Sequence, residues 1–431
     1  MRIILMVTVL MLALRCVGQE EQKEAVVRFT FEDCINYAYG NSYERQSLEL
    51  TRQSQDLSLQ QSKRDRLPSV SAHVSEGFSN SNDGSLFSGS AGIDASVSVY
   101  QGGSIKNNIE IQELALEQAG MELQQYDDNL SIQILQAFLT ILGNEELLKY
   151  QEEVLNSSYE IMRQGAVKFE AGAMIESDYL LLEAQYATDT NNVVDTRIAI
   201  ENSLLNLKLL MSMDASTPLE VIFPDTADIA QLSVLPSLEE ALSAAESYSP
   251  ELKMGQYDID IAGMNVKLSK SDMLPSVSVG AGLNTGHSGW GNMGNQLVNE
   301  LSESVSLSLS IPIYNKGNTR LKVKQSEIEL QRTQLSLANS RFVLRQTVTE
   351  EYYNVLSTYN KYKVSKLSAD AYLKSFEAYN SQFLYGTITA YDLLSQQLGY
   401  TEALNSYIQN KYSFILQRKI LDIYMGKKIT F

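Results

Sequence analysis

The chain has 431 residues, 44% of them hydrophobic and 20% charged, which is typical of folded proteins and unlike disordered chains. Its formal net charge of −18 counts against nucleic-acid binding, because phosphate recognition needs a basic surface. Two cysteines and two histidines leave little material for a disulfide scaffold, a zinc site or a catalytic triad, so we expect no enzyme, no cofactor and no metal centre.

The amino terminus has the layout of a secretory signal. Arg2 gives a short basic start, and the apolar stretch that follows, about a dozen residues, is short for a bilayer-crossing helix. We expect residues 1–18 to be a signal peptide. A lipoprotein signal through Cys16 is the weaker alternative, because Arg15 stands where a small residue is expected. No later run of about 20 apolar residues follows, so the exported chain can enter a membrane only as β-structure.

The two halves of the chain repeat the same landmarks. Residues 67–71 and 274–278 both read Leu-Pro-Ser-Val-Ser, and similar helix starts precede them at Phe31 and Leu238. Such a recurrence indicates an internal tandem repeat. In each copy we expect a short helix, a longer helix, two strands and a long helical hairpin, with a proline-bearing linker closing the first copy. The predicted copies are residues 19–235 and residues 236–431.

Two segments in each copy alternate strictly between apolar and small polar residues. Val, Ala, Leu, Ile and Phe occupy one face, and Ser and Gly occupy most of the other, which is the pattern of β-strands. Each segment has about ten residues, the length that a membrane-crossing strand needs. Loops rich in Gly, Ser and Asn are expected between the members of each pair. The predicted strands are residues 69–79 and 91–100 in the first copy and residues 276–285 and 303–313 in the second.

These strands have two interpretations. They form either two surface hairpins on a soluble core or part of a barrel wall with lipid outside. The near absence of Lys and Glu from the polar faces favours the barrel wall. Four strands cannot close a barrel, and open edges are not tolerated in lipid, so copies of the chain must share one barrel. Two copies would supply eight strands and three would supply twelve. We prefer three, because the serine faces favour an open lumen.

The segments after the strands lack proline and are rich in Gln, Glu, Leu and Lys, which favours long helices. The predicted helical hairpins are residues 104–213 and 318–425. Apolar residues occur in pairs two apart that repeat every seventh residue, and residues two apart point to nearly opposite sides of a helix. We therefore expect each helix to have a neighbour on both sides, as in a closed ring; a fully buried core helix is the alternative. The pairs in the second copy are Ile328/Leu330, Leu335/Leu337 and Phe342/Leu344.

Together these features resemble the TolC-like outer membrane efflux family. The resemblance covers essentially the mature chain and depends on the duplicated helix starts, the duplicated Leu-Pro-Ser-Val-Ser and two turns, at 169–178 and 383–392. It implies an α+β membrane protein of the Gram-negative outer membrane: a homotrimer whose twelve-stranded barrel continues into a long periplasmic helical barrel. It also implies contact with outer-membrane lipid and docking to a periplasmic adaptor and an inner-membrane pump, of the RND or ABC type.

The resemblance places a gate and an adaptor contact at the tips of the two hairpins. Gly172 and Gly386 match turn glycines, and a tight helical turn needs a residue that tolerates positive φ there. Asp178 and Asp392 match tip aspartates, which either line the pore or simply cap the returning helices. We expect capping at Asp178, whereas Asp392 falls where some members have an acidic ring. The position of a second ring holds Ser395, so a double ring is not expected, and Phe383 completes the candidate gate.

The sequence therefore favours a passive exit duct of a tripartite efflux or type I secretion system, gated by an iris-like opening of the helix tips. The alternative is a periplasm-spanning coiled-coil scaffold or adhesin without transport. That alternative predicts one apolar stripe per helix and no lipid-facing strands. The substrate cannot be read from the sequence.

Overall fold

A computed structural model describes the protein in residues 26–81, 84–222, 232, 234–289 and 291–428. The expected signal peptide, residues 1–18, lies outside the described residues. The chain divides into two compact units, each of which takes segments from both halves of the sequence. The first unit comprises Met1–Tyr43, Asp128–Ala241 and Thr349–Phe431, and the second comprises Glu44–Asp127 and Leu242–Val348. The units therefore cut across the predicted repeat, because each long helix contributes to both of them.

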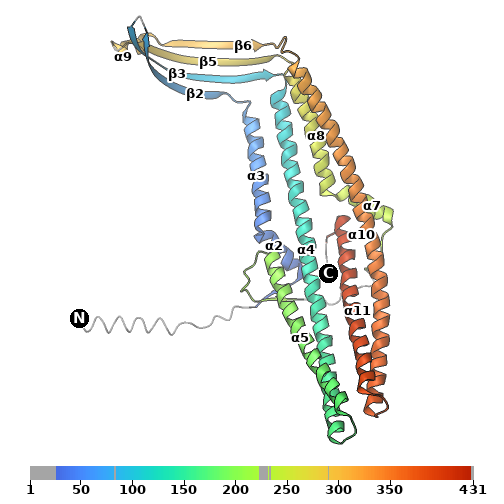
Figure 1. The fold of residues 1–431 in the computed structure, drawn as a ribbon. Helices are drawn as coiled ribbons and strands as arrows, with labels where there is room; N and C mark the ends of the chain where they lie inside the picture. The colour runs from blue at the N-terminus through green and yellow to red at the C-terminus, as the bar shows by residue number, and fades with distance from the viewer. Residues whose placement is uncertain (1–25, 82–83, 223–231, 233, 290, 429–431) are drawn as a thin grey trace, which may run out of the picture. The chain divides into compact units, whose positions relative to one another are not determined.

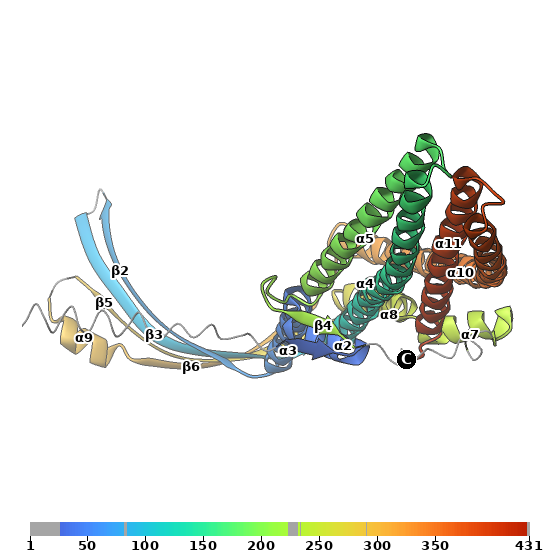
Figure 2. The ribbon, with the colours of Figure 1, turned by 90° about the horizontal axis from the view of Figure 1, so that it is seen from below.

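The second unit contains a four-stranded antiparallel sheet with the order β2-β3-β5-β6 (Figure 1). Strands β2 and β6 are its edges, and the strands bend along their length (Figure 2). The strands are β2 (Ser69–Ser81), β3 (Gly84–Gln101), β5 (Ser276–Ser288) and β6 (Ser302–Ser310).

One face of this sheet is mainly apolar and largely exposed. Seven of its large side chains are more than half exposed, namely Val70, Val74, Phe78, Ile93, Val305, Leu307 and Leu309. The other face is small and polar: Ser69 and Ser96 lie opposite each other with their hydroxyls 3.1 Å apart. His73 Nδ1 lies 3.0 Å from Asp94 Oδ2 on that same polar face. The alternation in the sequence thus corresponds to two chemically distinct faces.

Strands β2 and β5 end at Ser81 and Ser288, two and three residues after the predicted ends, and further differences are found at β3, at β6 and in the loop between β5 and β6. Strand β3 begins at Gly84 and not at residue 91, because the ladder with β2 continues until Ser81 pairs with Gly84. Strand β6 ends at Ser310 and not at residue 313, which fits Pro312, since proline has no N–H for a ladder. The loop expected between β5 and β6 contains a short helix, α9 (Met293–Asn299).

The helices of the second unit form a row in the order α3, α4, α8, α10. The row is joined by polar contacts from Arg45 to Asp127 (2.8 Å), Gln118 to Asp258 (2.8 Å) and Ser269 to Ser326 (2.9 Å). Two of its members, α4 (Ser104–Glu170) and α10 (Asn318–Leu384), have 67 residues each and are about 100 Å long at 1.5 Å per residue. The other two are α3 (Tyr43–Arg64) and α8 (Pro250–Ser271).

The two helices at the ends of this row carry uncovered apolar stripes at every seventh residue. Of the two predicted stripes on α10, one is covered. Leu344 is buried, and Leu337 packs against Gly255 of α8, where a Cβ added to the glycine would lie 2.9 Å from the Leu337 side chain. The second stripe faces no other element of the unit, and α3 has a similar stripe. The exposed residues are Leu321, Ile328, Leu335 and Phe342 on α10, and Leu50 and Leu57 on α3.

The first unit packs two helical hairpins around one apolar core (Figures 1 and 2). One hairpin joins the end of α4 to α5 (Glu176–Leu210), and the other joins the end of α10 to α11 (Ala390–Tyr424). All four helices contribute to the core, including Val154, Leu182, Phe376 and Leu404. The smaller elements are α2 (Phe31–Asn41) and the parallel pair of β1 (Val27–Phe29) and β4 (Leu219–Val221), while α7 (Leu238–Tyr248) spans the boundary of the units. Among the helices of the described ranges, none has an apolar stretch long enough to cross a membrane.

Candidate gate at the helix tips

Both hairpins of the first unit turn through the same backbone motif. Gly172 has a φ of 70° and Gly386 a φ of 73°, in the left-handed region where a side chain is strained. At the first turn the N–H of Gly172 donates to Phe169 O (2.9 Å) and the N–H of Ala173 donates to Lys168 O (2.8 Å). The second turn repeats this pattern around Gly386. This is a Schellman motif, which satisfies the last carbonyls of a helix within a short turn.

The two returning helices begin differently. Helix α11 starts with a capping box: Thr389 Oγ1 accepts from the N–H of Asp392, and Asp392 Oδ2 accepts from the N–H (3.1 Å) and hydroxyl (2.7 Å) of Thr389. These hydrogen bonds from Thr389 lower the pKa of the Asp392 carboxyl. Helix α5 has Ile175 at the matching N-cap, whose side chain has no oxygen to accept a hydrogen bond, so no capping box forms around Asp178. The capping geometry is therefore found at Asp392, although we expected capping at Asp178.

A lysine links the tips of the two hairpins. Lys168, in the last turn of α4, places its Nζ 2.6 Å from the carbonyl oxygen of Phe383 in the last turn of α10, and 4.4 Å from the centre of the Phe383 ring. The ring itself is buried, with 2% of its surface exposed. A cation is favourable at this position, because the last carbonyls of a helix carry partial negative charge.

The predicted gate residues thus fall into three environments. Gly172 and Gly386 form the turns, Phe383 is buried between the hairpins, and Ser395 lies exposed on α11, one turn after Asp392. Sequence reasoning missed Lys168 and Thr389. Thr389 had a visible signal, because Thr-x-x-Asp at a helix start is a capping-box pattern, whereas the Lys168 contact joins residues that are far apart in the sequence.

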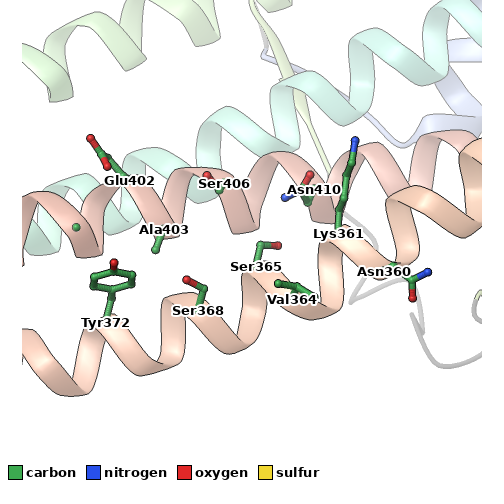
Figure 3. A pocket seen from close by; sticks show the side chains of 11 residues that line it. Asn360, Lys361, Val364, Ser365, Ser368, Tyr372, Glu402, Ala403, Ser406 and Asn410 are labelled. Atoms are coloured by element: carbon green, nitrogen blue, oxygen red, sulfur yellow. The ribbon is translucent and has the colours of Figure 1, made fainter.

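A groove runs along the second hairpin, between α10 and α11 (Figure 3). It has a volume of about 600 Å³ and is lined mainly by small and polar residues, including Ser365, Ser368 and Ala403, with Lys361 and Glu402 at its sides. Gly399 lies in the wall of the groove, where a Cβ would come within 2.8 Å of the Tyr372 ring.

Comparison with solved structures identifies the fold. CusC, described in connection with transmembrane channel formation, superposes with a TM-score of 0.81 over 92% of this chain and 92% of its own, at 15% sequence identity. At that identity the likeness shows the fold alone, which is the α+β fold of outer-membrane channels.

The family follows from the sequence. Residues 35–212 and 241–427 match the outer membrane efflux protein family, and the chain belongs to it. The outer membrane protein TolC of Vibrio cholerae is 23% identical over 79% of this chain and 80% of its own. The alkaline protease secretion protein AprF of Pseudomonas aeruginosa is 22% identical over 69% of this chain and 61% of its own. The protein is thus an outer membrane efflux or secretion channel component of Gram-negative bacteria, with a periplasmic extension.

Proposed function

We propose that three copies of this chain form a passive exit duct, in which a twelve-stranded barrel continues into a periplasmic ring of helices. The observation that carries the proposal is that the second unit has two unpaired edges in its sheet and two uncovered ends in its row of helices. In the sheet, the edges are β2 and β6; in the helical row, the ends are α3 and α10 with their exposed stripes. Because α3 leads directly into β2 and β6 leads into α10, one contact between neighbouring copies can close both layers.

Three copies fit this arrangement better than two. Head-to-tail contacts between a first and a second edge generate a ring when the rotation closes. The four strands of one chain cannot close by themselves, eight make about the smallest barrel, and twelve leave a wider interior. The Ser and Gly face of the sheet favours an interior filled with water, and the uncovered apolar face suits lipid.

A passive duct needs energy from a partner. We infer that the chain works with a periplasmic adaptor and an inner-membrane pump of the RND or ABC type. One relative is named for alkaline protease secretion and another for toxin and drug export. The substrates of this chain are therefore either proteins or small molecules. The tips of the hairpins are the proposed gate and adaptor contact, formed by Gly172, Asp178, Phe383, Gly386, Asp392 and Ser395.

A charge placed in the exposed stripe tests the assembly. The variant Leu335→Glu should prevent trimer formation in detergent, since a buried unpaired carboxylate costs several kcal/mol at each interface, on the order of 3–5. Ser336→Glu, at the neighbouring exposed position, points about 100° away from both stripes of the same helix; it is the control and should assemble like the unchanged protein. Mass determination in detergent followed by single-channel recording in planar bilayers gives both readouts. Trimers of Leu335→Glu would contradict the proposed edge. A chain that is soluble without detergent and never conducts would instead support the scaffold alternative.

A further inference from the structure

The core of the first unit contains a carboxyl group that the proposed duct does not use. Asp189 on α5 is 4% exposed. Its Oδ1 accepts from Gln185 Nε2 (3.0 Å) on the same helix, and its Oδ2 accepts from the Ser158 hydroxyl of α4 and from Gln397 Nε2 (2.9 Å) of α11. Gln397 Nε2 also donates to Ser158 Oγ (2.7 Å). One carboxyl group therefore joins the first hairpin to the second.

No cation balances this carboxyl group within the described residues. Asp189 takes part in none of the ion pairs found there. The side chains that bond to it or line the adjoining cavity from α4, α5 and α11 are amides, hydroxyls and aliphatic groups, none of them titratable. Burial away from water raises the pKa of the Asp189 carboxyl, against the opposing effect of its three hydrogen bonds.

A small polar cavity adjoins the carboxyl group. It has a volume of about 10 Å³, enough for one water molecule, and Asp189 lines it together with Gln151 of α4 and Asn405 of α11. The side-chain oxygens of both amides are buried and have no hydrogen-bond partner among the described residues. One water molecule could donate to both of these oxygens, and it would then need a donor itself. A neutral carboxyl group with its O–H can be that donor, whereas a carboxylate cannot.

We propose that Asp189 is a proton-binding site that couples the two hairpins, neutral while α4, α5 and α11 are packed around it and ionised when the hairpins part. Packing the hairpins then takes up one proton, and separating them releases it. The site itself needs no assumption about transport; only its effect on conductance rests on the proposed function.

The direction of the pH effect follows from linkage. Below the ordinary aspartate pKa of 3.8 the carboxyl group is neutral in both states, and packing carries no proton-linked cost. Between that value and the raised one, the packing equilibrium weakens about tenfold per pH unit, and above the raised value the loss is constant. Acid therefore favours packed hairpins, and alkali favours separated ones.

The test compares Asp189→Asn with Asp195→Asn in the full chain in detergent. Asparagine keeps the size of the side chain but cannot ionise, and the half-exposed Gln185 amide can rotate to accept its new N–H group. Asp195 is the matched control, because it also accepts from an amide four residues earlier, Asn191, but lies exposed on α5. The thermal unfolding midpoint is measured from pH 4 to pH 8.5. The midpoint difference between Asp189→Asn and the unchanged protein should grow with pH, and Asp195→Asn should show no such growth.

Parallel pH curves for Asp189→Asn and the unchanged protein would overturn the proposal. If Asp189→Asn does not fold, amide exchange of the unchanged protein is measured instead. The protection of α5 and α11, corrected for intrinsic exchange, should fall from pH 5 to pH 8. Constant protection would also overturn the proposal. Conductance of the same proteins is a separate readout. A pH-dependent midpoint with pH-independent conductance would uphold the proton site and count against gating by hairpin separation.

Discussion

The contact between Lys168 and Phe383 allows the strength of the tip closure to be tested. The variant Lys168→Met keeps an apolar stem of similar length but removes the ammonium group, and with it the 2.6 Å hydrogen bond to the Phe383 carbonyl and the contact with its ring. Hydrogen bonds that involve a charge contribute about 1.5–3 kcal/mol, and a half-exposed cation over an aromatic ring adds about 0.5–1 kcal/mol. We therefore expect the tips to lose about 2 kcal/mol, which is about 30-fold in the equilibrium between closed and parted tips.

Amide exchange measures this loss at the place where it arises. The N–H of Gly386 donates to the same Phe383 carbonyl that Lys168 contacts, and the N–H of Thr387 donates to the neighbouring Gln382 carbonyl, so both should exchange faster in Lys168→Met. Arg163→Met is the control: Arg163 lies on the same helix, and its ion pair with Glu160 is exposed and local, worth at most about 0.5 kcal/mol. Equal exchange at Gly386 in the two variants would refute the reasoning. In planar bilayers, Lys168→Met should also open more often than the control.

Four further tests address the turns and caps. Gly386→Ala should destabilise the first unit by about 1–2 kcal/mol, because the φ of 73° is left-handed, and thermal unfolding would show it; an unchanged midpoint would mean that the turn can rearrange. Thr389→Ala should flatten the acid limb of the pH–stability curve. The lowered pKa of Asp392 gives a contribution to the free energy of unfolding that is present above pH 3.8, the ordinary pKa of aspartate, and is lost as the pH falls through the lowered pKa. Ile175→Thr should supply the missing N-cap oxygen to α5 and stabilise that helix by about 1 kcal/mol, seen as slower exchange in its first turn. Asp392→Ala should change conductance or its block by cations if the carboxylate lines the pore, and unchanged behaviour would leave it as a cap only.

The alternation of the strands was readable from the sequence because each face has its own chemistry. Their ends were less readable. The segment from Gly84 to residue 90 is rich in Gly and Ser, which reads as a loop, yet its backbone continues the ladder with β2. Backbone pairing needs no particular side chain, so composition underestimates strand length there. The two stripes of α10 were visible, but only the structure distinguishes the stripe that α8 covers from the one left open.

The tip turns were predictable from the family resemblance together with the conformational needs of a tight turn, whereas the contacts between hairpins were not. A glycine that must adopt positive φ is fixed by the turn itself, so Gly172 and Gly386 could be named in advance. Asp189 gave no such signal, because an aspartate in a polar helix is ordinary until its surroundings are known. Its burial depends on Ser158 and Gln397, which belong to other helices.

The open edges of the sheet have a consequence for how the protein folds in the cell. Among the described residues, strands β2 and β6 each have one neighbouring strand, so in the proposed trimer half of their backbone pairing comes from another molecule. The free energy of completing the sheet then depends on protomer concentration, as mass action requires for obligate oligomers. In the proposed trimer, folding and assembly become one reaction, and a newly exported chain must be shielded from unintended edge partners until two further copies arrive.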